Sequence, residues 1–202
     1  MKRLTALFLM LLLLLSLSAC GNSAQNPSGS AGNNNSQGED PSEAENPEDA
    51  EAGFPFTLTT KDGAEVTFTQ VPETVLCTNV NTGDQLMALG LGDKIIATAN
   101  NNTQVAPEFR EEYEAIPQMD DKPSLETILD MEPDFVYGRS SAFSEKYNTE
   151  HDTLSQYGIM SLSSIEGYKL GADLEDVYQD FYNLGRIFQV EDKAEEIVSA
   201  MK

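Results

Sequence analysis

The sequence predicts an α/β fold, in which a parallel sheet is flanked by helices. Short apolar runs typical of buried strands alternate with segments of helical periodicity over residues 75–162. Strands that are separated by helices join as parallel βαβ units. The first quarter of the chain has a different composition, so we expect the fold to begin near residue 54.

The acidic composition excludes one class of partner. The 202-residue chain has 12 Lys and Arg against 34 Asp and Glu, a formal net charge of −22 at pH 7. Such a chain repels phosphate, so we expect no nucleic-acid partner. It has two cysteines, Cys20 and Cys77, and a single histidine, His151. The two cysteines lie in unrelated contexts, and their number and spacing do not indicate a disulfide framework.

The N-terminus is typical of an exported, lipid-anchored protein. Lys2 and Arg3 precede an almost wholly apolar stretch over residues 4–17. That stretch is too short to span a bilayer comfortably and fits a signal peptide. The order Leu-Ser-Ala-Cys at residues 17–20 resembles the bacterial lipobox, whose cysteine is acylated after cleavage just before it. We therefore expect a signal peptide over residues 1–19 and a lipidated Cys20 on the extracytoplasmic face of the cell membrane.

A polar segment follows the lipobox. Residues 21–53 contain no apolar side chain larger than Ala or Pro, and residues 39–51 are acidic without any Lys or Arg. Such a segment cannot bury enough surface to offset the entropy of ordering its backbone. We expect residues 20–53 to be a disordered acidic tether between the membrane and the folded part.

The folded part should open with a hairpin and a buried strand. Thr57–Thr59 and Val66–Phe68 alternate in polarity around the turn Lys61-Asp62-Gly63, which indicates an antiparallel pair. The apolar run Val75–Thr78 then predicts the first strand of the parallel sheet.

Helices should alternate with the later strands. Thr82 with Gln85 three residues later forms a capping-box pattern that predicts the start of a helix, and Gly90 predicts its end. The same unit recurs further along the chain. We expect strands at Ile95–Ala97, Phe135–Tyr137 and Ile159–Leu162, and helices at Ser124–Met131 and Lys146–Tyr157.

Two more helices should follow the sheet. Asp173 can cap a helix whose apolar residues recur at helical spacing, and Glu191 begins another. The helix that begins at Glu191 runs to Lys202 without a Gly, a Pro or a cap to end it. We therefore expect the sequence to be cut within a helix.

Three stretches of the chain form a recognisable set: Asp84–Gly90 with Asp93–Ile96, Pro123–Leu129 with Glu132–Val136, and Leu174–Gly185 with Glu191–Glu195. They resemble one family, the solute-binding proteins of ABC importers for iron–siderophores, haem and cobalamin. The first stretch resembles that family's E-x-L-x-A-L-G…D-x-I-V pattern, with Asp where Glu is usual, and the second its S-x-E-x-I-L-x-L-x-P-D-L-V pattern. The third resembles the approach to its long connecting helix.

The resemblance implies a fold and a role. The family has two Rossmann-like α/β lobes joined by one long helix, with the ligand between them. Residues 54–172 would be the N-terminal ligand-binding lobe and residues 173–202 the helices leading into the connecting helix, with the second lobe absent. The chain would be a monomeric receptor that captures a siderophore, haem or corrinoid and delivers it to an ABC permease dimer. It would need no intrinsic cofactor and no bound metal.

Candidate ligand contacts lie in loops after the strands, because ligands of open α/β sheets bind at the carboxyl ends of strands. Arg139 is the sharpest candidate, since a guanidinium pairs carboxylate, phosphate or phenolate groups bidentately. An Asn in such a loop can equally serve turn geometry. A fourth loop, residues 163–166, lies at the same edge. The expected ligand contacts are Asn79, Asn81, Asn101, Arg139, Ser140, Ser141 and Phe143.

Glu126 is assigned a separate role by the resemblance. The family's Glu in this position docks on arginines of the permease. A carboxylate in the first turn of a helix is also favoured by the helix dipole alone, so the residue has an ordinary structural explanation too.

Three further residues have simpler interpretations. Tyr147 and His151 could ligate haem, but a lone Tyr and His on a polar helix are more often exposed. Cys77 lies in an apolar run, which predicts a buried small hydrophobic residue.

Other functions are less well supported. A divalent-metal receptor needs several His and carboxylate ligands, and the chain has one His. A non-transport surface lipoprotein fits the α/β pattern equally. An enzyme is not expected, because the sequence has no G-x-G-x-x-G, P-loop, G-x-S-x-G or Cys/His pair.

Replacing Cys20 by Ala should release the protein from the membrane. Stable attachment needs acyl chains that each contribute about 0.8 kcal/mol per buried CH₂, and the variant has no thiol to carry them. Membrane and medium fractions of a bacterium expressing either form give the measurement. Equal membrane retention of both forms would show that Cys20 is not the anchor.

Overall fold

The computed structural model describes residues 53–60, 63–101, 103–119, 121–165, 167 and 170–202. In these residues a five-stranded sheet has the order β5-β4-β3-β6-β7, with every neighbouring pair parallel. The predicted α/β fold with a parallel sheet is therefore confirmed. The strands are β3 (Val75–Cys77), β4 (Ile95–Ala99), β5 (Gln118–Met119), β6 (Phe135–Gly138) and β7 (Met160–Ser163).

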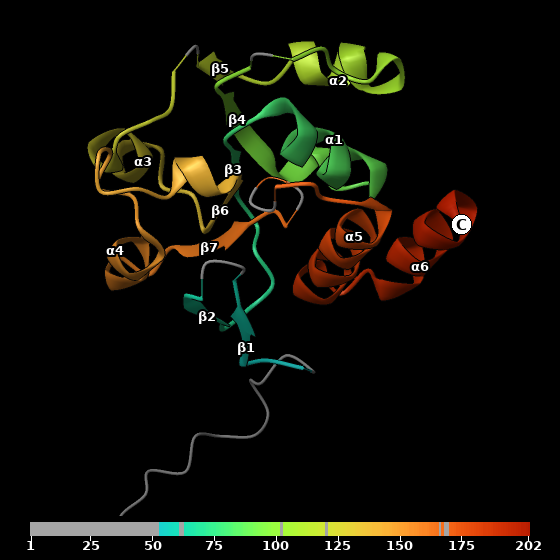
Figure 1. Ribbon diagram of the computed structural model, residues 1–202. Helices are drawn as coiled ribbons and strands as arrows, with labels where there is room; N and C mark the ends of the chain where they lie inside the picture. The colour runs from blue at the N-terminus through green and yellow to red at the C-terminus, as the bar shows by residue number, and fades with distance from the viewer. Residues whose placement is uncertain (1–52, 61–62, 102, 120, 166, 168–169) are drawn as a thin grey trace, which may run out of the picture. The chain divides into compact units, whose positions relative to one another are not determined.

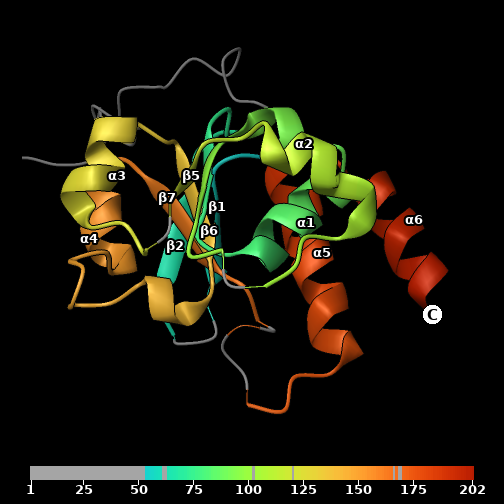
Figure 2. The ribbon, with the colours of Figure 1, turned by 90° about the horizontal axis from the view of Figure 1, so that it is seen from above.

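Helices cover both faces of this sheet. Helices α3 and α4 lie on one face, and α1, α5 and α6 lie on the other (Figures 1 and 2). The helices are α1 (Val80–Ala88), α2 (Arg110–Glu114), α3 (Leu125–Met131), α4 (His151–Gln156), α5 (Leu174–Phe188) and α6 (Glu191–Met201). Three short 3₁₀ helices are η1 (Gly92–Lys94), η2 (Pro107–Phe109) and η3 (Ser140–Ala142).

The two faces of the sheet carry separate cores because successive side chains of a strand point to opposite faces. Val75 and Cys77 of β3 join a cluster with α1 and α5 residues, whereas Leu76 joins Ile128 of α3 and Leu154 of α4. All five side chains are at least 99% buried. Strands buried on both faces appear in the sequence as continuous apolar runs, which is why β3 and β6 were predictable.

The predicted hairpin is present as β1 (Phe56–Thr59) and β2 (Glu65–Phe68). Its rings extend the core: Phe56 stacks on Phe68 with centroids 5.3 Å apart, and Phe68 meets Phe135 edge-on at 5.8 Å. Arg186 of α5 lies 3.9 Å from the centroid of the Phe56 ring. The hairpin therefore packs at the amino end of β6 and on α5, since Phe135 is the first residue of β6.

A carboxylate aligns the starts of the central strands. Asp134 Oδ2 accepts hydrogen bonds from the backbone N–H of Glu73 (2.9 Å) and of Thr74 (3.2 Å). The Asp134 N–H in turn donates to Thr74 Oγ1 (2.9 Å), and the Asp134 carbonyl accepts from Met160 N (2.9 Å). The Asp of the P-D motif thus ties β3, β6 and β7 at their amino ends.

Two predicted helix caps are confirmed and a third is wrong. Ser124 caps α3, with its Oγ accepting from Thr127 N at 3.4 Å, and Asp173 forms a capping box with Asp176 at α5. The predicted start at Thr82 is wrong. Helix α1 begins at Val80, and the Thr82 hydroxyl donates backwards to the Asn79 carbonyl at 2.9 Å. A capping Thr accepts from the N–H two or three residues later, whereas a Thr inside a helix can donate to a backbone carbonyl in the preceding turn.

The predicted helix over Lys146–Tyr157 is shorter than expected. It begins only at His151, because Lys146 and Asn148 lie in a turn and Asn148 has a positive φ of 56°. Helix α2 and strand β5 were not predicted. Both are short and polar, and β5 is defined by its pairing with β4. The predicted signal peptide, Cys20 and nearly all of the tether lie outside the described residues.

Replacing Asp134 by Ala should lower the free energy of unfolding by about 1.5–3 kcal/mol, the range for hydrogen bonds to a charged group. Asp134→Asn should cost less, because an amide oxygen can still accept. Asp130→Ala is the matched control, since Asp130 is an exposed carboxylate four residues earlier. Urea unfolding gives the comparison. Equal losses for Asp134→Ala and Asp130→Ala would contradict the role of Asp134 in strand alignment.

Candidate functional site

The order of the sheet reverses between β3 and β6. The chain proceeds from β3 to β4 and β5 on one side, then returns to place β6 and β7 on the other side. In open α/β sheets the crevice at the carboxyl ends of strands flanking such a reversal is where ligands bind. Residues 78–79, after β3, and residues 139–143, after β6, therefore form the centre of the candidate site.

Asn79 lies on the β3 side of the site. This residue is 4% exposed and lies at the N-cap position of α1 without capping the helix through its side chain. Its carbonyl and Oδ1 instead accept from Thr82 Oγ1, at 2.9 and 3.2 Å. Asn81 was expected in a loop, but it lies in α1 and is exposed. The early start of the helix explains this difference.

Asn101 follows β4 and is fixed by two side chains. Its Nδ2 donates to Thr98 Oγ1 at 3.1 Å, and the Tyr113 hydroxyl donates to its Oδ1 at 2.5 Å. Burial raises the pKa of Tyr113, so the phenol remains protonated and able to donate. The Asn101 amide keeps one N–H and one lone pair for other partners.

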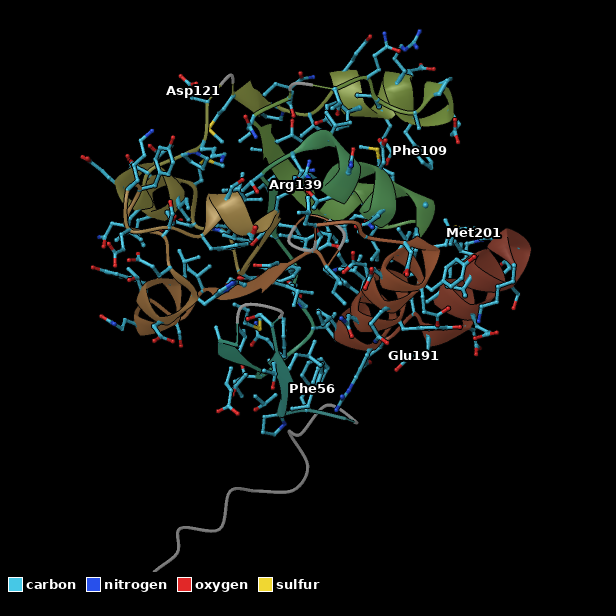
Figure 3. All side chains as sticks on the ribbon, viewed as in Figure 1. Phe56, Phe109, Asp121, Arg139, Glu191 and Met201 are labelled. Carbon is cyan, nitrogen blue, oxygen red and sulfur yellow. The ribbon has the colours of Figure 1, made fainter. Side chains whose placement is uncertain are left out.

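Arg139 begins the loop after β6 and is exposed (Figure 3). Ser140 and Ser141 follow it in η3, not in an irregular loop, and the Ser140 hydroxyl donates to the Gly167 carbonyl at 3.4 Å. Lys122 donates to the Ser141 carbonyl at 3.0 Å. The loop thus presents a guanidinium while its backbone is tied to neighbouring segments.

The expectation that His151 is exposed is wrong. His151 is 5% exposed, and its ring nitrogens pair with Ser161 Oγ (2.7 Å) and Ser163 Oγ (3.0 Å) of β7. Its ring stacks on Phe143 with centroids 4.2 Å apart. The His151 ring is therefore engaged in the fold and lacks a free nitrogen for haem. It also covers one face of Phe143, which is itself 8% exposed.

Cys77 is buried and free, as expected. Burial raises the pKa of its thiol to about 12, because the thiolate would lose its hydration in the core. Cys77 therefore remains neutral and fills space beside α1.

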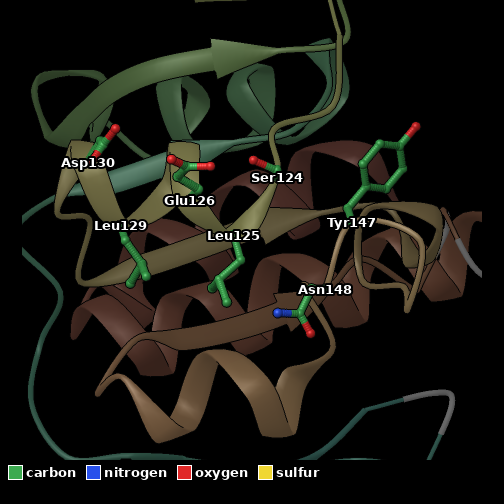
Figure 4. A pocket seen from close by; sticks show the side chains of 7 residues that line it. All are labelled: Ser124, Leu125, Glu126, Leu129, Asp130, Tyr147 and Asn148. Atoms are coloured by element: carbon green, nitrogen blue, oxygen red, sulfur yellow. The ribbon is translucent and has the colours of Figure 1, made fainter.

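Glu126 lies in the first turn of α3 and is exposed. It lines a pocket of about 400 Å³ between α3 and the turn at Tyr147 (Figure 4). The pocket is lined by Ser124, Leu125, Glu126, Leu129, Asp130, Tyr147 and Asn148. Asp130 was not singled out from the sequence, although its i,i+4 spacing from Glu126 places both carboxylates on one helix face. Tyr147 lies in a turn and not on the expected helix.

The described residues bear on two other roles. Within the described ranges, no group of three or more His, Cys, Asp and Glu is arranged to hold a metal ion. No helix among the same residues combines the length and apolarity needed to cross a membrane.

Comparison with known proteins gives a consistent result. Residues 75–202 match the family described as "Periplasmic binding protein". Over 149 residues the chain is 25% identical to an ABC transporter substrate-binding lipoprotein of Bacillus subtilis (strain 168), covering 74% of this chain and 45% of that protein.

Solved structures agree in fold. A periplasmic binding protein from Veillonella parvula is 29% identical with a TM-score of 0.65, covering 73% of this chain and 49% of that one. An ABC-type Fe³⁺-hydroxamate transport protein from Saccharomonospora viridis is 25% identical with a TM-score of 0.59, covering 73% and 53%. The chain thus spans about half the length of these relatives.

Proposed function

The chain belongs to the periplasmic binding protein family, and from this premise we propose that it forms the ligand-binding lobe of an extracytoplasmic receptor. The receptor captures an iron–siderophore or a related chelate and delivers it to an ABC importer. The family is one of binding proteins, which confirms the expectation that the chain is not an enzyme. The observation that carries the proposal is the reversal of strand order at β3 and β6, which brings Asn79 and Arg139 to one edge.

The chemistry of the strand edge and one relative both favour an anionic iron chelate as the ligand. Siderophores and haem bear anionic oxygen groups, and an exposed guanidinium at the strand ends is suited to pair with them. The Saccharomonospora viridis protein belongs to a transport system for Fe³⁺-hydroxamate, which favours a hydroxamate chelate here. The corrinoid alternative rests on the sequence resemblance alone.

Delivery requires contact with a permease, and the acidic pocket on α3 is the proposed contact. Glu126 and Asp130 present two carboxylates on one face of α3, and Leu125 and Leu129, whose side chains point the other way, also line the pocket (Figure 4). Exposed charges of this kind guide association and specify the partner, and their effect weakens as salt rises. A basic surface on the importer is therefore the expected partner. A lipid anchor at Cys20 would keep the receptor close to it.

Replacing Arg139 by Ala should weaken binding of a ferric trihydroxamate by roughly 10- to 100-fold, because a charge-assisted pair contributes about 1.5–3 kcal/mol. Arg110→Ala is the matched control, since Arg110 is exposed on α2. Isothermal titration of a receptor that carries both lobes, and of both variants in it, gives the dissociation constants, with haem as a second probe. Binding that is equally tight in all three proteins would remove Arg139 from the site. Absence of binding to both probes would sink the proposed ligand class.

Replacing Glu126 by Ala should slow ligand uptake and leave ligand affinity unchanged. Its effect on folding should be small, about 0.3–1 kcal/mol from the helix terminus. Glu175→Ala is matched, because Glu175 is also an exposed carboxylate in a first helical turn. Uptake into vesicles containing the importer, measured at low and high salt, separates the two roles. If both variants transport normally and differ only in thermal midpoint, Glu126 is a helix-end residue and not a docking residue.

A further inference from the structure

Tyr113 is a buried tyrosine whose hydroxyl lies at the carboxyl edge of the sheet, where it bonds Asn101. It is 2% exposed and belongs to α2, the short helix that the sequence did not predict. Helix α2 lies beside α1 (Figures 1 and 2), and a Cβ on Gly83 of α1 would come within 3.0 Å of Tyr113 Cε2. The Tyr113 ring therefore packs directly on α1, where a side chain at residue 83 would press against it.

The segment that carries α2 is tied together on both sides of the helix. The Asn100 N–H, before α2, donates to the carbonyl of Met119, after it, at 3.1 Å. Gln118 Nε2 donates to the Tyr113 carbonyl at 3.2 Å. These bonds do not involve the phenol. We therefore expect α2 to stay in place when only the Tyr113 hydroxyl is removed.

The two hydrogen bonds of the Asn101 amide differ in length, and the difference identifies its two ends. Tyr113 Oη lies 2.5 Å from Asn101 Oδ1, a distance typical of an O–H···O bond and too short for an N–H···O bond. Asn101 Nδ2 lies 3.1 Å from Thr98 Oγ1, a distance typical of an N–H···O bond. The amide oxygen therefore faces Tyr113, and the amide nitrogen faces Thr98.

The phenol is what makes this orientation unique. A Thr hydroxyl can donate or accept, so Thr98 alone could bind either end of the Asn101 amide. The short bond to Tyr113 tolerates only the oxygen and so excludes the turned amide. Without the phenol, the amide could present its carbonyl oxygen where the nitrogen now lies. Anionic ligand oxygens are acceptors, so they gain a bond from an N–H group and are repelled by a carbonyl lone pair.

We propose that Tyr113 is a positioning residue of the candidate site, whose hydroxyl fixes the Asn101 amide so that it offers an N–H donor to the acceptor oxygens of the ligand. The role of α2 is then to carry this hydroxyl to the strand edge, with the ring seated on α1 at Gly83. The inference rests on the proposed function, because it assigns the polarity of one contact at the same edge.

Tyr113→Phe removes the hydroxyl and keeps the ring. The probe is a gallium(III) trihydroxamate, the diamagnetic counterpart of the ferric chelate, which is titrated into the full chain while the amide resonances of residues 79, 101 and 139 are followed by NMR. We expect the Kd of the probe to rise about fivefold or more in Tyr113→Phe, because one hydrogen bond to the ligand is lost or replaced by repulsion.

Tyr178→Phe is the matched control. Tyr178 is 6% exposed, and its hydroxyl donates to the Met201 carbonyl at 3.3 Å, where α5 meets α6. Both variants lose one phenol hydrogen bond, so both should lower the thermal midpoint. Only Tyr113→Phe should change the Kd of the probe.

A double-mutant cycle separates an effect through Asn101 from a general loosening of the fold. Asn101→Ala removes the amide on which the Tyr113 hydroxyl acts. In that background Tyr113→Phe should change the Kd by less than about twofold. The side-chain amide of Asn101 gives a second measurement, without any probe. It should show one set of NMR resonances in the unmodified chain and in Tyr178→Phe, and a broadened or second set in Tyr113→Phe.

Three results would overturn the role of Tyr113. They are a Kd unchanged in Tyr113→Phe, a Kd that rises as much in the Asn101→Ala background as in the unmodified chain, and an Asn101 amide that keeps a single sharp set of resonances in Tyr113→Phe. Failure of the proposed function is distinguishable. In that case the probe shifts no resonance of the unmodified chain, while the Asn101 amide of the free chain still responds to Tyr113→Phe.

Discussion

The candidate site depends on the carboxylate of Asp134. The carboxylate accepts hydrogen bonds from the backbone before β3, and the Asp134 carbonyl accepts one from Met160 of β7. These bonds set the register in which Val75 lies opposite Phe135, and Phe135 opposite Met160. In the β3–β6 and β6–β7 pairs the register continues unchanged along the strands. The alignment made at the amino ends therefore decides which residues meet at the carboxyl ends. A slip of one residue would reverse every side chain between the two cores and move Thr78 away from Gly138.

The elements that the sequence predicted are those with a strong local signal. Doubly buried strands appear as apolar runs, and Ser124 and Asp173 carry the side-chain oxygen that a helix start needs. Strand β5 has no such signal, because Gln118 and Met119 become a strand only by pairing with Thr98 and Ala99 of β4. The pairing is a property of the assembled sheet. Helix α1 was misplaced because a Thr hydroxyl can bond the backbone inside a helix as well as at its start, so the residue type alone does not fix the boundary.

The sequence predicts which loops lie at the candidate site. Strand ends place Asn79 and Arg139 at one edge, and the position of each loop after an apolar run was visible in the sequence. The hydrogen-bond and stacking partners of each side chain could not be predicted from the sequence, because they come from distant segments. His151 illustrates this, since its two serines lie on a strand that follows it and its stacking partner precedes it. The buried position of the Thr78 hydroxyl was equally unpredictable, because the hydroxyl occupies the space that a side chain at residue 138 would take.

The hairpin determines how a mechanical load would enter the fold. The described chain begins beside β1, whose first residue pairs with the last residue of β2, Phe68. A pull from the N-terminal side would therefore peel the hairpin one pair at a time, starting from Phe56 and Phe68. That first pair is the one reinforced by the Phe135 ring and by Arg186. The load would meet the contacts of Phe56 and Phe68 first, at the amino end of β6 and at the opposite end of that strand from Arg139.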